Sequence, residues 1–208
     1  MTAIPKILLI SHVYLFILIQ FGVPHVFGFS LIEEPLQNLV RTVLTFAPVN
    51  VAMFHAFAKG GSFRTEVFGA WIVGTIVVHI IVVTFGAPVV ELFQLTLAWS
   101  ALLSTIAVIP AAVCLGIKRE TWFRIFVDFR PRNMDELAIA ITSLASILGS
   151  WLGAIPIPLD WDEPWQAWPV TLVYGSVLCA LLSSSAFYLI SRFKFVDLRS
   201  MISHSRDS

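Results

Sequence analysis

The sequence predicts an all-α, polytopic membrane protein with six transmembrane helices and both termini in the cytosol. Its 208 residues are 58% hydrophobic and 12% charged, and the mean hydropathy is +0.87. A soluble globular domain carries about 25% charged residues, roughly twice that fraction. Six apolar segments each approach the ~20 residues that a helix needs to cross the hydrocarbon core. The loops between them alternate between basic and acidic, and this alternation orients the chain.

The six expected helices follow one another with short loops, and neither a repeat nor a large soluble domain interrupts them. They are placed at 7–28, 36–57, 67–85, 89–117, 137–156 and 169–191. The first follows Lys6 as a signal peptide would, but it is long and lacks an A-x-A cleavage site, so an uncleaved first helix is favoured. The chain 1–208 is therefore expected to form a single membrane domain.

Positive charge marks one side of the membrane. Basic residues precede the first helix or follow the second, fourth and sixth: Lys6, Lys59, Arg64, Lys118, Arg119, Arg124, Arg130, Arg132, Arg192, Lys194, Arg199 and Arg206. The remaining loops hold only acids: Glu33, Glu34, Glu91, Asp160, Asp162 and Glu163. Since cytosolic loops are enriched in Lys and Arg, both termini are expected in the cytosol and the loop at 154–169 on the opposite, luminal or exterior side.

The longest cytosolic loop has a helical pattern of its own. In KRETWFRIFVDF, residues 118–129, an apolar face is formed by Trp122, Ile125, Phe126 and Phe129. This pattern predicts a short helix lying on the membrane surface, with a continuation of the fourth helix as the alternative. Asn133, followed three residues later by Glu136, predicts a capping box that opens the fifth helix.

Small residues recur every four positions in the last two helices. The fifth carries Ala145, Gly149 and Gly153, and the sixth carries Ser176, Ala180 and Ser184. Such stripes let helix backbones approach closely where lipid provides no hydrophobic drive. The prediction is that helices five and six pack tightly together, or that one stripe receives a helix of another protein.

Two polar residues within the spans are candidates for binding a lipid headgroup. Arg41 lies about five residues into the second helix, near its outer end, and His79 lies toward the same side. A lone Arg in a span is costly unless it reaches the interface or a partner. Arg41 could therefore bind a lipid phosphate, or it could pair with an internal acid such as Glu91.

Other functional classes find little support. The net charge is formally zero, so no nucleic-acid partner is expected. The two cysteines, Cys114 and Cys179, fall in apolar runs, and no metal or cofactor motif, P-loop or GxSxG is present. Asp160 and Asp162 could serve a lipid-acting enzyme, and Arg41 a lipid carrier, so both remain as alternatives to a non-catalytic role.

The loop AIPIPLDWDEPWQAWP, residues 154–169, combines rigidity, aromatic residues and acids. Pro156, Pro158 and Pro164 restrict the backbone, and Pro169 suits the start of the sixth helix. The tryptophans of this region suit a membrane interface: Trp151, Trp161, Trp165 and Trp168. An aromatic belt explains the tryptophans but not the prolines and acids together.

The longer stretch GSWLGAIPIPLDWDEPWQAWP, residues 149–169, closely resembles the signature of the PIG-F family of glycosylphosphatidylinositol (GPI) anchor biosynthesis. The resemblance extends upstream through FGAP at 85–88 and WSALLSTIAVIP at 99–110. One departure stands out, because this chain has Glu163 where the family usually has Arg. That change puts in doubt any role that relies on a positive charge in the loop.

The resemblance implies a non-catalytic subunit of the endoplasmic reticulum membrane with no cofactor. It would stabilise the large multi-pass ethanolamine phosphate transferases that modify the second and third mannoses of the GPI precursor. The residues expected to bind the partner are Gly149, Trp151, Gly153, Pro156, Pro158, Asp160, Trp161, Asp162, Pro164, Trp165, Gln166 and Trp168. The alternative for Asp160, Trp161, Asp162, Trp165 and Gln166 is that they lock the hairpin that presents the contact.

Overall fold

The computed structural model describes residues 3–57, 64–88, 90–159 and 161–204. Within these ranges all regular structure is helical, and six helices are long and apolar enough to cross a membrane. These spans are Ile4–Phe27, Pro35–Ala56, Thr65–Thr84, Phe93–Leu115, Met134–Ala154 and Val170–Phe193. The six-helix prediction is confirmed for the described part of the chain, with bounds that differ by a few residues.

The elements follow in a simple order. Helix α1 (Ile4–Ile17) continues through a π-helical turn, η1 (Leu18–Gly22), into α2 (Val23–Phe27). Then come α3 (Pro35–Phe57), α4 (Arg64–Thr84) and α5 (Phe93–Leu115). The short α6 (Arg119–Trp122) and the π-helical turn η2 (Phe123–Val127) precede α7 (Met134–Ala154). A 3-10 turn, η3 (Pro164–Gln166), leads to α8 (Val170–His204).

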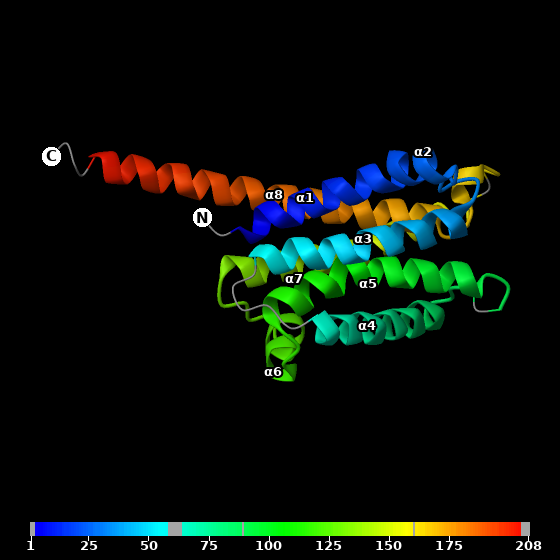
Figure 1. Ribbon diagram of the computed structural model, residues 1–208, viewed down its shortest axis with the longest axis horizontal. Helices are drawn as coiled ribbons and strands as arrows, with labels where there is room; N and C mark the ends of the chain where they lie inside the picture. Colours follow the sequence, from blue (N-terminus) through cyan, green and yellow to red (C-terminus); the bar gives the residue numbers. More distant parts are fainter. Residues whose placement is uncertain (1–2, 58–63, 89, 160, 205–208) are drawn as a thin grey trace.

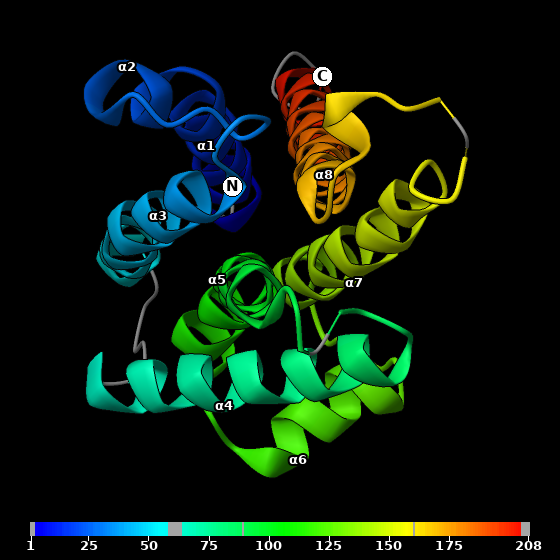
Figure 2. The same cartoon turned by 90° about the vertical axis from the view of Figure 1, so that its right-hand side faces the viewer.

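Helix α5 is the centre of the bundle (Figures 1 and 2). Helices α3, α4 and α7 all pack on it, while α1 and α8 pack on each other. In the most apolar stretch of α5, 78% of the residues are buried, against 11% in α4. Because α4 makes its extensive contacts with α5 alone, most of its surface is left for lipid or for another protein.

Polar side chains inside the bundle join helices that are far apart in sequence. Ser11 Oγ donates to Asn50 Oδ1 (2.9 Å), and Asn50 Nδ2 donates to the Thr105 carbonyl (2.9 Å), so α1, α3 and α5 are linked. His12 Nδ1 and Ser184 Oγ lie 3.2 Å apart and link α1 to α8. Since lipid offers no hydrogen-bond partners, these pairs satisfy polar groups and fix which helices are neighbours.

A buried amide holds the irregular turn of the first helix. A π-helical turn interrupts the regular hydrogen-bond ladder of a helix. Asn38 of α3 is fully buried, and its Nδ2 donates to the carbonyls of Ile19 (3.3 Å) and Phe29 (2.8 Å). The end of the first span and the loop after it are thereby fixed to α3.

Residues 118–129 do not continue the fourth span. Helix α5 ends at Leu115, Gly116 has a φ of 74°, and α6 runs across the bundle axis (Figure 1). The prediction of a separate short helix is therefore confirmed, and the alternative of a continuation is wrong. The glycine explains the break, because a left-handed φ is open to it at little cost.

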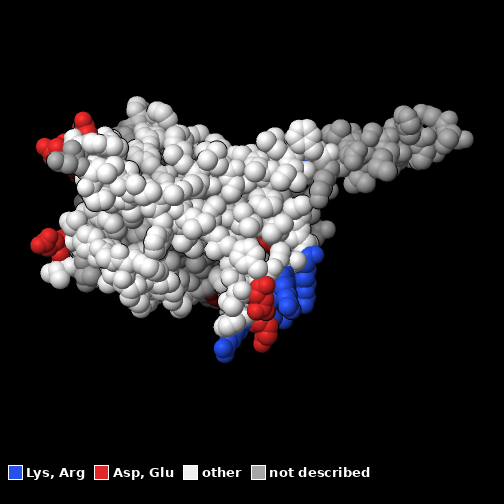
Figure 3. Space-filling model, turned by 180° about the vertical axis from the view of Figure 1, so that it is seen from behind, with Lys and Arg blue, Asp and Glu red and all other residues white. Residues whose placement is uncertain are grey.

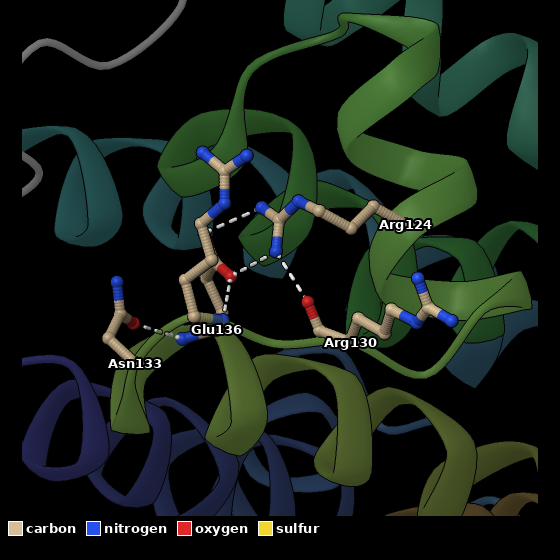
Figure 4. Close-up of polar contacts among 5 residues, drawn as sticks. Arg124, Arg130, Asn133 and Glu136 are labelled. Carbon is tan, nitrogen blue, oxygen red and sulfur yellow. Dashed lines mark hydrogen bonds and ion pairs between the residues drawn. The ribbon is translucent and has the colours of Figure 1, made fainter.

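The start of α7 is anchored to this short helix (Figure 4). Asn133 Oδ1 accepts from the Glu136 N–H (2.9 Å), as the capping motif predicted, but the Glu136 carboxylate accepts from the Arg132 N–H (2.6 Å). Arg124 donates to both carboxylate oxygens of Glu136 (2.8 and 2.9 Å) and to the Arg130 carbonyl (2.6 Å). The hydrogen bonds to Glu136 raise the pKa of the Arg124 guanidinium. A bidentate pair of this kind fixes orientation as well as distance.

Candidate functional site

Residues 149–169 connect α7 to α8 at one end of the bundle, together with the loops 28–34 and 85–92 (Figure 1). We call this the acidic end, since the charged residues that the structure describes in these three loops are Glu33, Glu34, Glu91, Asp162 and Glu163. Lys and Arg gather with other acids at the opposite end, around α6 (Figure 3). The charge separation expected from the sequence is therefore present in three dimensions.

Gly149 and Gly153 of α7 lie directly against the backbone of α8. A Cβ atom at Gly149 would overlap the carbonyl of Gly175, and one at Gly153 would overlap the carbonyl of Thr171. Gly175 is equally confined, because its Cβ would overlap the Gly149 carbonyl. Helices α7 and α8 make the most extensive contact of any pair described. The prediction that helices five and six pack tightly is confirmed.

The stripe on α8 is not the one that the sequence pattern indicated. Thr171, Gly175 and Cys179 meet the two glycines of α7, whereas Ser184 of the predicted stripe contacts His12 of α1. Serine and alanine permit a small helix separation, but only glycine permits backbone to touch backbone. Gly175, next to the predicted stripe, was the signal that could have identified the correct face.

Gln166 holds the loop together through side-chain hydrogen bonds inside it. The residue is 9% exposed, and its Nε2 donates to the carbonyls of Pro156 (2.6 Å) and Leu159 (2.8 Å). Its Oε1 accepts from the Glu163 N–H (3.0 Å), and the Glu163 side chain accepts from the Gln166 backbone N–H. One carboxamide thus joins both halves of the loop, and the capping box starts η3.

Trp168 ties the loop to the start of α5. Its Nε1 donates to Thr96 Oγ1 (3.1 Å), and Thr96 Oγ1 donates to the Pro88 carbonyl (2.9 Å). The Trp168 ring also meets Trp99 edge to face, with centroids 5.7 Å apart. The loop between α4 and α5 and the loop between α7 and α8 are therefore held together by one chain of contacts.

Trp151 makes a second connection between the same two loops. This residue, near the end of α7, packs on Phe85, with ring centroids 4.5 Å apart and nearly perpendicular. The segments 85–88 and 149–169 both belong to the sequence resemblance, and the structure places them in contact. Sequence reasoning named the tryptophans but missed Thr96 and Phe85 as their partners.

Other loop residues face outward. Trp161 is 56% exposed, and its ring centroid lies 5.6 Å from that of Trp165. Pro158, Asp162 and Pro164 are also exposed. Asp162 has a φ of 50°, a left-handed conformation that Asp and Asn adopt more readily than most residues. Asp160 lies outside the described residues.

Arg41 and His79, the two candidates for a lipid headgroup, have separate partners. Arg41 is exposed on α3, and its guanidinium carbon lies 5.4 Å from the ring centroid of Phe27, a cation–π contact. His79 of α4 meets Phe93 edge to face (5.3 Å), and its Nδ1 lies 3.5 Å from Ser100 Oγ. Arg41 contacts an aromatic ring rather than the acid Glu91, and no contact joins it to His79.

Comparison with known proteins gives a match over most of the chain. Residues 15–187 match the model of the GPI biosynthesis protein family Pig-F. A human protein named GPI ethanolamine phosphate transferase, stabilizing subunit, is 40% identical over 98 residues, which are 47% of this chain and 45% of that protein. The mouse protein of the same name is 32% identical over 160 residues, 72% of this chain and 73% of its own length.

A third relative is a fusion protein. The PIGF/3-ketodihydrosphingosine reductase fusion protein of Schizosaccharomyces pombe is 41% identical over 107 residues, 51% of this chain and 21% of that protein. The match thus covers less than half the length of the human and fission-yeast relatives. No solved structure matches the chain.

Proposed function

The chain belongs to the Pig-F family of GPI biosynthesis proteins, and from this premise we propose that it is a non-catalytic membrane subunit that stabilises a GPI ethanolamine phosphate transferase. Two of its relatives carry that role in their names. The finer proposal is that its partners are the large multi-pass transferases acting on the second and third mannoses of the GPI precursor. We propose the endoplasmic reticulum membrane as its location, which a role in GPI biosynthesis implies.

The observation that supports this role most directly is that the loop of residues 154–169 is held by contacts within the subunit. Gln166, Trp168 and the α7–α8 glycines give the loop one fixed shape. That shape leaves Trp161 and Asp162 exposed rather than used inside the bundle. A surface that is ordered before binding loses little conformational entropy when a partner docks, which suits a stabilising subunit.

The expected partner-binding residues accordingly divide into two groups. Gly149, Gly153, Pro156, Gln166 and Trp168 are proposed to act indirectly, because they are engaged inside the subunit and set the shape of the loop. The direct contacts are proposed to come from the outward group, Trp151, Pro158, Trp161, Asp162 and Pro164, together with the half-buried Trp165. Asp160, which lies outside the described residues, is proposed to join them. The acids would meet basic groups on the transferase, and Glu163 in place of the family's Arg would strengthen that preference.

The test is a mild-detergent purification of the tagged full chain from its own membranes, followed by mass spectrometry. A large ethanolamine phosphate transferase in near-stoichiometric amount supports the proposal. A chain that purifies alone and turns over a phosphoethanolamine lipid would support an enzyme based on Asp160 and Asp162 instead. A chain that purifies alone and moves lipid in an Arg41-dependent manner would support a carrier.

Two substitutions separate shape from direct contact. Gly153→Leu forces α7 away from Thr171 of α8, so we expect it to lower the amount of transferase recovered more than Asp162→Asn does. Ala52→Leu, on the exposed side of α3, serves as the control and should leave recovery unchanged. Equal transferase levels in Gly153→Leu and Ala52→Leu would contradict the role assigned to the α7–α8 contact.

A further inference from the structure

An apolar cavity of about 630 Å³ lies between the two loops at the acidic end. Its wall residues include Phe85, Pro88, Trp99, Trp151, Ile157 and Trp168. None of the side chains that line it carries a charge. The volume falls within the ~300–1,000 Å³ of sites that bind small molecules, and mostly apolar walls are typical of such sites.

A second recess, of about 530 Å³, adjoins this cavity. It is lined by Asp162, Glu163 and Gln166, and Ile157 borders both spaces. The apolar cavity and the acidic recess therefore share one lining residue, Ile157. This arrangement fits an amphiphile whose polar end carries a positive charge.

We propose that the cavity and the recess together bind one zwitterionic glycerophospholipid of the bilayer. An acyl chain fills the apolar cavity, and the ammonium of the headgroup faces Asp162 and Glu163. An anionic headgroup fits poorly, because Arg41 is the one Lys or Arg among the residues described near this end, and it lies against Phe27. The proposal concerns the subunit alone and does not depend on the transferase.

The experiment exposes the purified full chain to equal amounts of palmitoyl-oleoyl phosphatidylcholine and phosphatidylglycerol, then measures retained lipid by native mass spectrometry. We expect one retained phosphatidylcholine per chain and little phosphatidylglycerol. Ala154→Leu fills the cavity and should lower lipid affinity about tenfold, which corresponds to about 1.4 kcal/mol of binding free energy. The matched control is Ala52→Leu, which places the same group in the groove between α3 and α4 and should leave occupancy unchanged.

Two further variants keep the test decisive if Ala154→Leu folds poorly. Trp151→Ala removes a half-exposed wall of the cavity and should reduce retention. Asp162→Asn should reduce the preference for phosphatidylcholine. Equal retention in the Ala154 and Ala52 variants, or a preference for phosphatidylglycerol in the wild type, would overturn the proposal.

Discussion

Gln166 shows how one side chain can determine the shape of a whole loop. Loop backbone that is buried must find hydrogen-bond partners, and three prolines leave this loop few N–H groups to supply them. The Gln166 carboxamide provides two donors and one acceptor at the centre of the loop, so it replaces the missing backbone ladder. Gln166 was expected either to contact a partner protein or to lock the hairpin that presents the contact, and its side-chain hydrogen bonds lie within the hairpin.

Replacing Gln166 by Ala should destabilise the protein and loosen the loop. Two carbonyls and one N–H lose their partner, which we expect to cost about 2–3 kcal/mol of the unfolding free energy. Thermal unfolding in detergent, with limited proteolysis of residues 155–166, measures the effect. Gln94→Ala is the control, because Gln94 is exposed at the same end of the molecule and should tolerate the change. Equal melting temperatures for the two variants would contradict the role given to Gln166.

The left-handed backbone at Asp162 sets a second limit at the residue scale. Asn and Gly accept a φ of 50° readily, whereas a β-branched residue does not. We expect Asp162→Asn and Asp162→Gly to unfold close to the wild-type temperature. Asp162→Val should cost about 1–2 kcal/mol from backbone strain. A Val variant as stable as the Asn variant would mean that the loop relaxes at this position.

At the scale of elements, the α7–α8 contact depends on glycines that meet backbone. Gly149→Ala should destabilise the bundle by about 2–3 kcal/mol, because the new methyl group meets the Gly175 carbonyl and the helices must separate. Gly69→Ala on α4 is the matched control, since nothing lies within 4 Å of the position its Cβ would take. That change should be neutral or slightly stabilising, because Ala favours helix more than Gly does. Similar losses at both sites would show that helix propensity, not contact, governs them.

The link between η2 and α7 depends on the geometry of one guanidinium group. Lysine cannot reproduce the bidentate contact of Arg124 with Glu136 or its bond to the Arg130 carbonyl. We therefore expect Arg124→Lys to speed hydrogen–deuterium exchange across residues 119–133. Arg130→Lys keeps the carbonyl acceptor and should leave exchange unchanged. Equal exchange in both variants would argue that charge alone holds the segment.

The helices were the most predictable elements, for a physical reason. A bilayer demands about 20 apolar residues per span, so composition marks each helix without knowledge of its neighbours. The π-helical turn at Leu18–Gly22 was not predicted, although Pro24 just after it removes a backbone donor from the helix. The bond from Asn38 of α3 to the Ile19 carbonyl within this turn has no local sequence signal. The face of α8 that meets α7 was also missed, since a stripe of Ser and Ala resembles a stripe containing Gly175 until both helices are placed.

At the scale of the whole molecule, the two ends of the bundle differ in charge, and this difference predicts its orientation. N-glycosylation acceptor sites inserted in the loops 28–34 or 160–163 should be modified in microsomes, because these loops are expected in the lumen. The same insertion within 117–133 should remain unmodified. Glycosylation in the second region but not the first would reverse the proposed topology.

The candidate site was predictable as a segment but not as an arrangement. The motif at 149–169 could be recognised in the sequence because prolines, tryptophans and acids occur together in one short run. The residues that contact this motif could not be recognised, since Thr96, Phe85 and Trp99 lie elsewhere in the chain and have no distinctive local pattern. Arg41 was expected to bind a phosphate or an acid, and the nearby ring of Phe27 could not be inferred from spacing alone.

The contact between the first and last helices has a consequence for biosynthesis. His12 and Ser184 are separated by 172 positions in the chain, so α1 leaves the ribosome long before α8 has been synthesised. Until α8 enters the membrane, an imidazole that lipid cannot satisfy remains without its hydrogen bond. The nascent bundle is thus incomplete until α8 has been inserted. A premature stop codon before α8 should therefore eliminate the subunit through quality control rather than leave a working five-helix remnant.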